Sequence, residues 1–170
     1  MGTNRKILAG IGIMILLLIG VMGLRPTAPI TVVYATEDGE VLSIDEPIPP
    51  YSYQNDDGVL VVDISQDSPF YPGEGEGLSV NSTYVFDGVF SIENNQSETG
   101  YEEICVRISS DFPNMGFFVG SFNGNWEEVI EVTLAADESV DVGMRVNTTG
   151  LELGDYWNEI TIEAWGGNCG

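Results

Sequence analysis

Apolar and polar residues alternate along several short segments of this chain. In residues 84–93 one face of an extended chain collects apolar side chains and the opposite face collects polar ones. The apolar members of that segment are Tyr84, Phe86, Phe90 and Ile92. The same two-residue period recurs in residues 104–109, 130–134, 140–147 and 159–163. This period is typical of β-strands that bury one face, so each segment is predicted to be a strand.

Three further apolar segments, rich in β-branched residues, lie nearer the N-terminus at residues 30–35, 41–44 and 58–65. Pro residues and an Asn-Asp-Asp-Gly turn signal bound them, which again predicts strands. Residues 112–126 are too Gly-rich for a helix, and no segment after Gly23 keeps a helical period. Seven or so short strands, each with one apolar face, predict an all-β fold, an immunoglobulin-like (Ig-like) or jelly-roll β-sandwich.

The Leu-Glu-Leu-Gly-Asp-Tyr sequence that ends at Tyr156 stands just before the last predicted strand. It looks like the tyrosine corner of Ig-like sandwiches, in which the Tyr hydroxyl donates to an upstream backbone carbonyl. An ordinary turn before a strand is the alternative interpretation.

The N-terminal residues are far more apolar than the rest of the chain. Residues 7–22 form a continuous apolar and Gly run after Arg5 and Lys6, which is typical of an export signal. Small residues allow cleavage after Gly23 or after Ala35, and we favour Gly23; a retained membrane anchor is the alternative. The expected organisation is a signal or anchor at 1–23, an N-terminal extension at 24–40 and the β-sandwich domain at 41–170. The expected location is extracellular or at the cell surface.

The net charge and the absence of His exclude several kinds of active site and partner. The 170 residues include 27 acids against 5 Lys and Arg, for a formal net charge of −22, and no His. After residue 23 three arginines face all 27 acids, a balance of −24. A Ser-His-Asp triad and a His-ligated zinc site are therefore excluded. Nucleic acid is not an expected partner, since phosphates need clustered Lys and Arg.

The two cysteines are Cys105, within a predicted strand, and Cys169, one residue before the end of the sequence. In an exported protein such a pair predicts a disulfide, and two free thiols are the alternative. Closing a loop of this length would stabilise the fold by about 4 kcal/mol in the chain-entropy model.

Other candidate chemistry is weak. The carboxylate doublets Glu102/Glu103, Glu127/Glu128 and Asp137/Glu138 are expected to be solvated rather than a glycosidase-like pair. Residues 55–58 and 74–76 offer oxygen ligands for Ca²⁺ but lack the EF-hand spacing, so no metal or cofactor is predicted. No enzymatic activity is expected.

Three Asn-X-Ser/Thr sequons could carry N-linked glycans, and they begin at Asn81, Asn95 and Asn147. Each lies at the edge of a predicted strand or in a turn.

The Phe-x-x-Val-Phe-x-Ile-x-Asn-Asn sequence of residues 86–95, with the late Gly-Asp-Tyr sequence, resembles TasA/camelysin-like surface proteins. The similarity covers about residues 58–164 and is closest to an archaeal branch of small exported proteins without a firm enzymatic role. The resemblance implies a jelly-roll or Ig-like sandwich and, for several members, extracellular filaments built by donor-strand complementation. The name camelysin implies a metalloprotease, but this chain has no His and no HExxH sequence, so that activity is not expected.

Residues 30–35 are apolar and lie just past the expected cleavage site. They either form the first strand of their own domain or insert into the open edge of a neighbouring copy, and the resemblance favours insertion. The expected donor strand consists of Ile30, Thr31, Val32, Val33, Tyr34 and Ala35, with Ile30, Val32 and Tyr34 as its inserting face. The expected acceptor core consists of Phe86, Phe90, Ile92, Ile104, Val106 and Ile108.

The resulting hypothesis is a non-enzymatic filament subunit whose only partner is itself, head to tail, with membrane contact only through the N-terminal segment before cleavage. A monomeric or anchored Ig-like surface or adhesion domain is the alternative, and a carboxylate-dependent hydrolase is a third. Because the domain is strongly acidic, assembly is expected to improve with salt or Ca²⁺.

Overall fold

A computed structural model describes residues 25–34, 47–56, 59–70 and 77–170, with residues 25–34 and 155 described through their backbone. The described chain contains ten strands and one short helix. They are β1 (Arg25–Tyr34), β2 (Ser52–Gln54), β3 (Leu60–Asp63), β4 (Thr83–Glu93), α2 (Gln96–Thr99), β5 (Glu103–Ser110), β6 (Met115–Val119), β7 (Val129–Ala135), β8 (Ser139–Asn147), β9 (Asp155–Trp157) and β10 (Ile160–Gly166).

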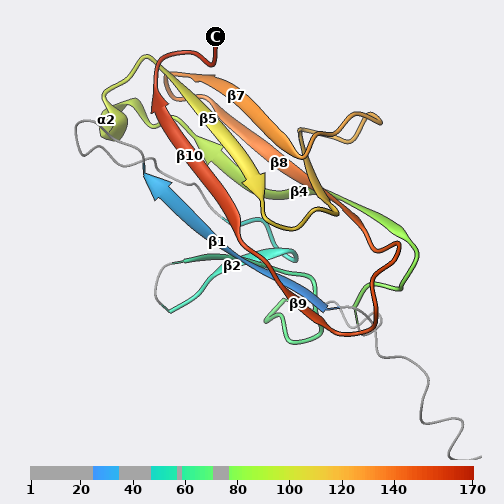
Figure 1. Cartoon of the computed structure of the whole chain (residues 1–170). Coiled ribbons are helices and arrows are strands. Elements are labelled where there is room, and N and C mark those ends of the chain that lie inside the picture. Colours follow the sequence, from blue (N-terminus) through green and yellow to red (C-terminus); the bar gives the residue numbers. More distant parts are fainter. Residues whose placement is uncertain (1–24, 35–46, 57–58, 71–76) are drawn as a thin grey trace, which may run out of the picture.

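The strands form two sheets that pack face to face, which confirms the all-β sandwich (Figure 1). The larger sheet has the order β2-β3-β1-β10-β5-β7, with β9 also paired to β1. The smaller sheet has the order β4-β8-β6. Alternating side chains of both inner faces fill one core between the sheets, as expected for such a sandwich.

The strand predictions hold for most of the chain, with three differences. Strand β1 begins at Arg25, five residues earlier than predicted, and so includes Pro26 and Pro29. The three-residue strands β2 and β9 were not predicted, and β6 lies inside the Gly-rich segment 112–126. The strand predicted at 41–44 and the signal or anchor at 1–23 lie outside the described residues.

Strand β6 escaped prediction because it does not alternate: four of its five residues, including Gly116, are buried. The loop after it folds back over the outer face of the smaller sheet. There the Trp126 ring covers Gly116, and the Phe118 ring covers Gly143 of β8, so closely that a Cβ atom at either glycine would clash. Phe122 of this loop donates its N–H to Asp87 of β4 at 3.0 Å.

The two asparagines at the end of β4 have separate structural roles. Asn94 is fully buried, accepts a hydrogen bond from the Thr99 hydroxyl at 2.7 Å, and donates to the carbonyls of Tyr101 and Leu134. Asn95 is the N-cap of α2, because its side chain accepts the Ser97 N–H. This pair therefore anchors the turn between β4 and β5 to β7.

No helix among the described residues is long and apolar enough to cross a membrane.

Candidate functional site

The most distinctive feature of the fold is the seam between its first and last strands. Strand β1 runs parallel to β9 from the pair Arg25↔Asp155 to Thr27↔Trp157, and then parallel to β10 from Ile30↔Ile160 to Tyr34↔Ala164. The offset between paired residues is the same along the whole seam. Residues 25–34 are thus paired with residues 155–164, far away in the sequence, in one continuous register.

The other side of β1 is only partly covered. Residues Thr27, Ala28 and Pro29 pair with β3 in antiparallel orientation. Among the described residues, no strand pairs with that side of the second half of β1, from Ile30 to Tyr34. Within the described residues, it is therefore β1 that joins the β2-β3 hairpin to the rest of the larger sheet.

The expected donor positions align with core-facing residues of β10. Ile30 and Val32 are in register with Ile160 and Ile162, which are both fully buried. The face that Ile30, Val32 and Tyr34 present stays a prediction. Ala35 lies outside the described residues.

The expected acceptor residues lie in the sandwich core or pack against it, and they come from two strands. Ile104, Val106 and Ile108 are buried on β5, which is separated from β1 by β10. Phe90 and Ile92 are fully buried on β4 in the facing sheet.

Phe86 is only partly buried, and its ring lies 5.2 Å from that of Tyr51. The direct neighbours of β1, Ile160 and Ile162, were missing from the expected acceptor set. Their apolar alternation before the C-terminus was visible in the sequence, but no local pattern identifies the strand with which they pair.

The predicted tyrosine corner is present. The Tyr156 hydroxyl donates to the Glu152 carbonyl at 3.0 Å, and its ring lies 5.9 Å from that of Phe112. Tyr156 belongs to β9, in register with Pro26 of β1. The corner therefore fixes the strand against which the first residues of β1 pair.

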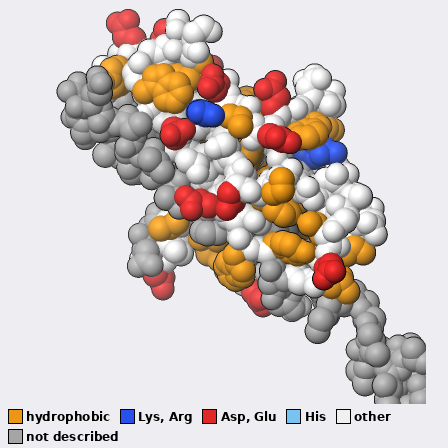
Figure 2. Space-filling view, viewed as in Figure 1, with side chains coloured by type: hydrophobic (Ala, Val, Ile, Leu, Met, Phe, Trp, Pro, Cys, Tyr) orange, Lys and Arg blue, Asp and Glu red, His pale blue; other side chains and the backbone are white. Residues whose placement is uncertain are grey.

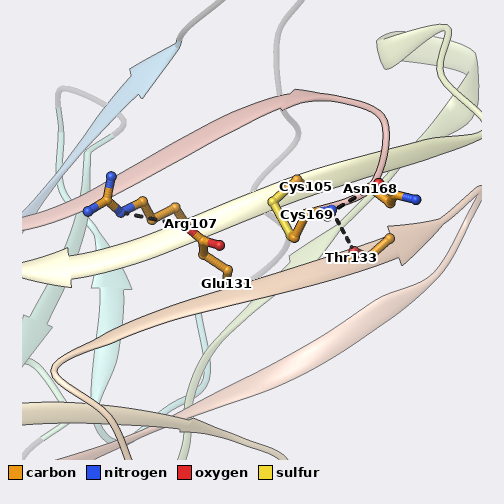
Figure 3. Close-up of a disulfide and its surroundings, with 7 residues drawn as sticks. Cys105, Arg107, Glu131, Thr133, Asn168 and Cys169 are labelled. Carbon is orange, nitrogen blue, oxygen red and sulfur yellow. Dashed lines mark hydrogen bonds and ion pairs between the residues drawn. A yellow bond between two sulfur atoms is a disulfide. The ribbon is translucent and has the colours of Figure 1, made fainter.

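The predicted disulfide joins Cys105 to Cys169 (Figure 3). Cys105 is completely buried on β5 beneath the C-terminal residues. The tail is held further by two hydrogen bonds, from Gly167 N–H to the Glu103 carbonyl at 2.8 Å and from Cys169 N–H to the Thr133 hydroxyl at 3.1 Å. The tail after β10 is thus fastened across β5 to β7.

The predicted carboxylate doublets, Glu102/Glu103, Glu127/Glu128 and Asp137/Glu138, are exposed. Figure 2 shows carboxylates scattered around isolated cations on one face of the molecule. Arg107 lies 4.0 Å from Glu131 and 3.9 Å from Glu163 on the outer face of the larger sheet. Exposed pairs of this kind contribute about 1 kcal/mol or less.

The weak Ca²⁺ candidates lie largely outside the described residues, which exclude 57–58 and 74–76. In the described part of the chain, no cluster of three or more Asp, Glu or Cys residues could hold a metal ion.

The three sequons lie at both ends of the sandwich. The amide oxygens of Asn81, Asn95 and Asn147 accept backbone N–H groups of Gly150, Ser97 and Thr149, respectively. Asn81 is exposed, while Asn95 and Asn147 are partly buried. Glycosylation at these positions stays a prediction.

A cavity of about 230 Å³ opens between the two sheets near β3 and β4. It is lined by aromatic rings, including Tyr51, Tyr84 and Phe86, and by the carboxylate of buried Asp63. A hydrogen bond from Ser79 lowers the pKa of Tyr84 below its usual value.

A comparison with protein families identifies the family of this chain. Residues 34–169 match the family model described as "Protein of unknown function (DUF1102)". The match begins at the last residue of β1 and extends through β10. No curated protein matches this chain significantly.

Proposed function

We propose that this chain, which belongs to the DUF1102 family of proteins of unknown function, is a non-enzymatic structural subunit of an extracellular filament. In this proposal β1 of one copy lies beside β9 and β10 of the next copy, and repetition of the contact joins subunits head to tail. The resemblance to TasA/camelysin-like proteins motivates the proposal. The observation that carries it is the continuous parallel register between the first and last strands.

That register supports exchange because a strand from another copy can reproduce it residue for residue. All described pairing partners of β1 lie on β3, β9 and β10. Insertion in trans would therefore form the same backbone hydrogen bonds as the intramolecular arrangement. Addition of a strand to an open sheet edge is an established mode of protein recognition.

Loss of β1 from its own sheet would leave a groove rather than a simple edge. The β2-β3 hairpin and the β10-β5-β7 part of the sheet would face each other with unpaired backbone groups. The groove would also expose part of the apolar surface around Ile160 and Ile162. Both costs are removed when a strand from outside fills the groove, which makes an unfilled subunit a strong acceptor.

The chain between the donor strand and the next described residue is long enough for exchange. Twelve residues, 35–46, separate Tyr34 from Pro47, which bridges to Phe90 on β4. An extended chain of this length reaches up to about 40 Å. A head-to-tail contact formed in this way does not close on itself and so produces a fibre.

The alternative is a monomeric or membrane-anchored surface domain. It is favoured by the placement of β1 in the sheet of its own chain. Both proposals share the export segment and the disulfide, which is compatible with an extracellular location. They differ only in which copy supplies β1.

Deletion of residues 27–35 tests the filament. The protein is recovered from an exporting host, as that host has processed it, and is measured by light scattering and negative-stain microscopy. We expect rod-like assemblies from the unmodified chain and monomers from the deletion variant. A synthetic peptide with the sequence of residues 25–35 should bind the deletion variant. Assembly that survives the deletion, or an unmodified chain that stays monomeric, would contradict the proposal.

A further inference from the structure

Strand β7 forms one border of the larger sheet (Figure 1). It pairs with β5 along its whole length, from Ser109↔Val129 to Glu103↔Ala135. In the described part of the chain no strand pairs with its other side. This border is distinct from the seam at β1.

The direction of the backbone groups on β7 follows from its C-terminal end. Ala136 donates its N–H to Glu102 on the β5 side, whereas Ala135 donates its N–H to the Glu138 carboxylate at 2.8 Å. Backbone groups of successive strand residues point to opposite sides. The N–H and C=O groups of Val129, Glu131 and Thr133 therefore point away from the sheet, as those of Ala135 do.

The composition of this edge offers little protection against pairing. Its sequence is Val-Ile-Glu-Val-Thr-Leu-Ala, with no Pro and a single charge. That charge belongs to Glu131, whose carboxylate lies 4.0 Å from the Arg107 guanidinium. A regular, weakly charged edge strand is a ready template for another extended chain.

We propose that β7 pairs in antiparallel orientation with β7 of a second copy, around a two-fold axis at Val132. In this register each Glu131 lies opposite Thr133 of the other copy, and these two residues carry outward-pointing backbone groups. The adjacent register, centred on Glu131, would place two carboxylates directly opposite each other, which destabilises a sheet. An interface in which the same strand serves both copies is the usual geometry of a symmetric dimer.

Acidic residues at both ends of β7 make this pairing dependent on salt. Glu127 and Glu128 precede the strand, and Asp137 and Glu138 follow it. An antiparallel pair brings the first doublet of one copy beside the second doublet of the other, on a chain of net charge −22. The screening length falls from about 10 Å at 0.1 M salt to about 3 Å at 1 M. The copies therefore stay apart at low ionic strength and associate at high ionic strength.

A matched pair of variants at Thr133 tests the proposal. Thr133→Pro removes an outward N–H but no hydrogen bond to β5, and edge strands tolerate Pro at such positions. Thr133→Val keeps that N–H and removes the hydroxyl that Cys169 uses, so it is the control. The full chain, as an exporting host processes it, is measured by sedimentation velocity between about 0.05 and 1 M NaCl.

At high salt we expect the average mass of the unmodified chain and of Thr133→Val to be about twice that of Thr133→Pro, because only the first two can pair through β7. Glu127→Gln/Glu128→Gln should move the association to lower salt. If Thr133→Pro does not fold, amide hydrogen exchange of the unmodified chain decides: the N–H groups of Glu131 and Thr133 should exchange more slowly at high salt. Equal masses of Thr133→Val and of a folded Thr133→Pro variant at high salt, or unchanged exchange at both amides, would overturn the proposal.

This pairing is independent of the filament proposal, because it uses the opposite border of the sheet. If copies are already joined through β1, the same edge joins two polymers side by side, and the comparison between the Thr133 variants still holds. Loss of head-to-tail assembly on deletion of residues 27–35 would leave the response of β7 to salt unchanged. The two proposals can therefore fail separately.

Discussion

Strand β1 and strand β10 with the tail that follows it lie side by side in the larger sheet, but different kinds of bond hold them there. The tail is fixed covalently through Cys105–Cys169, so it cannot leave the domain under oxidising conditions. Strand β1 contains no cysteine, and backbone pairing with β3, β9 and β10 places it in the sheet. The difference teaches which of the two segments the filament proposal can exchange between copies. The bridged tail keeps β10 in the sheet, while in the proposed filament the strand beside β10 comes from another chain.

The largest expected loss of stability follows from removal of the Cys105–Cys169 disulfide. Cys169→Ala opens the bridge and leaves the Cys105 thiol buried. Because the two cysteines are 64 positions apart in the sequence, we expect the free energy of unfolding to fall by about 4 kcal/mol in the chain-entropy model. Urea denaturation measures the loss, with Asn168→Ala as a neighbouring control. An unchanged unfolding free energy would mean that the bridge does not fasten the tail.

The next largest expected loss of stability follows from truncation of a buried apolar side chain of β10, at the seam with β1. Ile162 is fully buried and is in register with Val32 on one side and Ile108 on the other. We expect Ile162→Ala to lower the free energy of unfolding by about 3 kcal/mol, because it leaves a cavity in the core. Thr161→Ala, at the adjacent and partly exposed position, should cost less than about 1 kcal/mol, as most surface substitutions do. Equal losses in the two variants would show that β10 does not present one face to the core.

The smallest expected loss of stability follows from a change in β9, which pairs with the first residues of β1. Tyr156→Phe removes the hydrogen bond to Glu152 that holds the corner before β10. We expect a loss of about 1 kcal/mol, the typical net contribution of one hydrogen bond. Tyr101→Phe is the control, because no hydrogen bond of its hydroxyl joins it to the described residues. If the control loses as much stability as Tyr156→Phe, the corner has no special role in placing β9.

Local patterns in the sequence predicted the positions of the strands better than they predicted which strands pair with each other. Alternation located β4, β5, β7, β8 and β10, because each buries one face and exposes the other. It missed β6, where the loop carrying Trp126 covers the outer face and removes the polar positions. The two short strands β2 and β9 contain too few residues for any period.

Only those parts of the candidate site that have a local signal in the sequence were predicted. The pairing of Cys105 with Cys169 followed from having only two cysteines in a chain with an expected export signal. The Tyr156 corner followed from a short motif. The parallel partnership of β1 with β10 joins residues at opposite ends of the chain, so no local pattern could reveal it. The double Asn was noticed as a motif, but its roles as buried anchor and helix cap depend on Thr99 and Ser97 in three dimensions.

The most direct test of the head-to-tail proposal is a cross-link across the seam. Thr31 and Thr161 are register partners on adjacent strands, which lie about 4.8 Å apart, within the range that a disulfide spans. The Thr31→Cys/Thr161→Cys chain, recovered from an exporting host and mildly oxidised, is run on a denaturing gel without reductant beside each single variant. The account predicts a ladder of covalent multimers from the double variant and none from the single variants. A double variant that cross-links completely but migrates only as a monomer would show that β1 stays in its own domain.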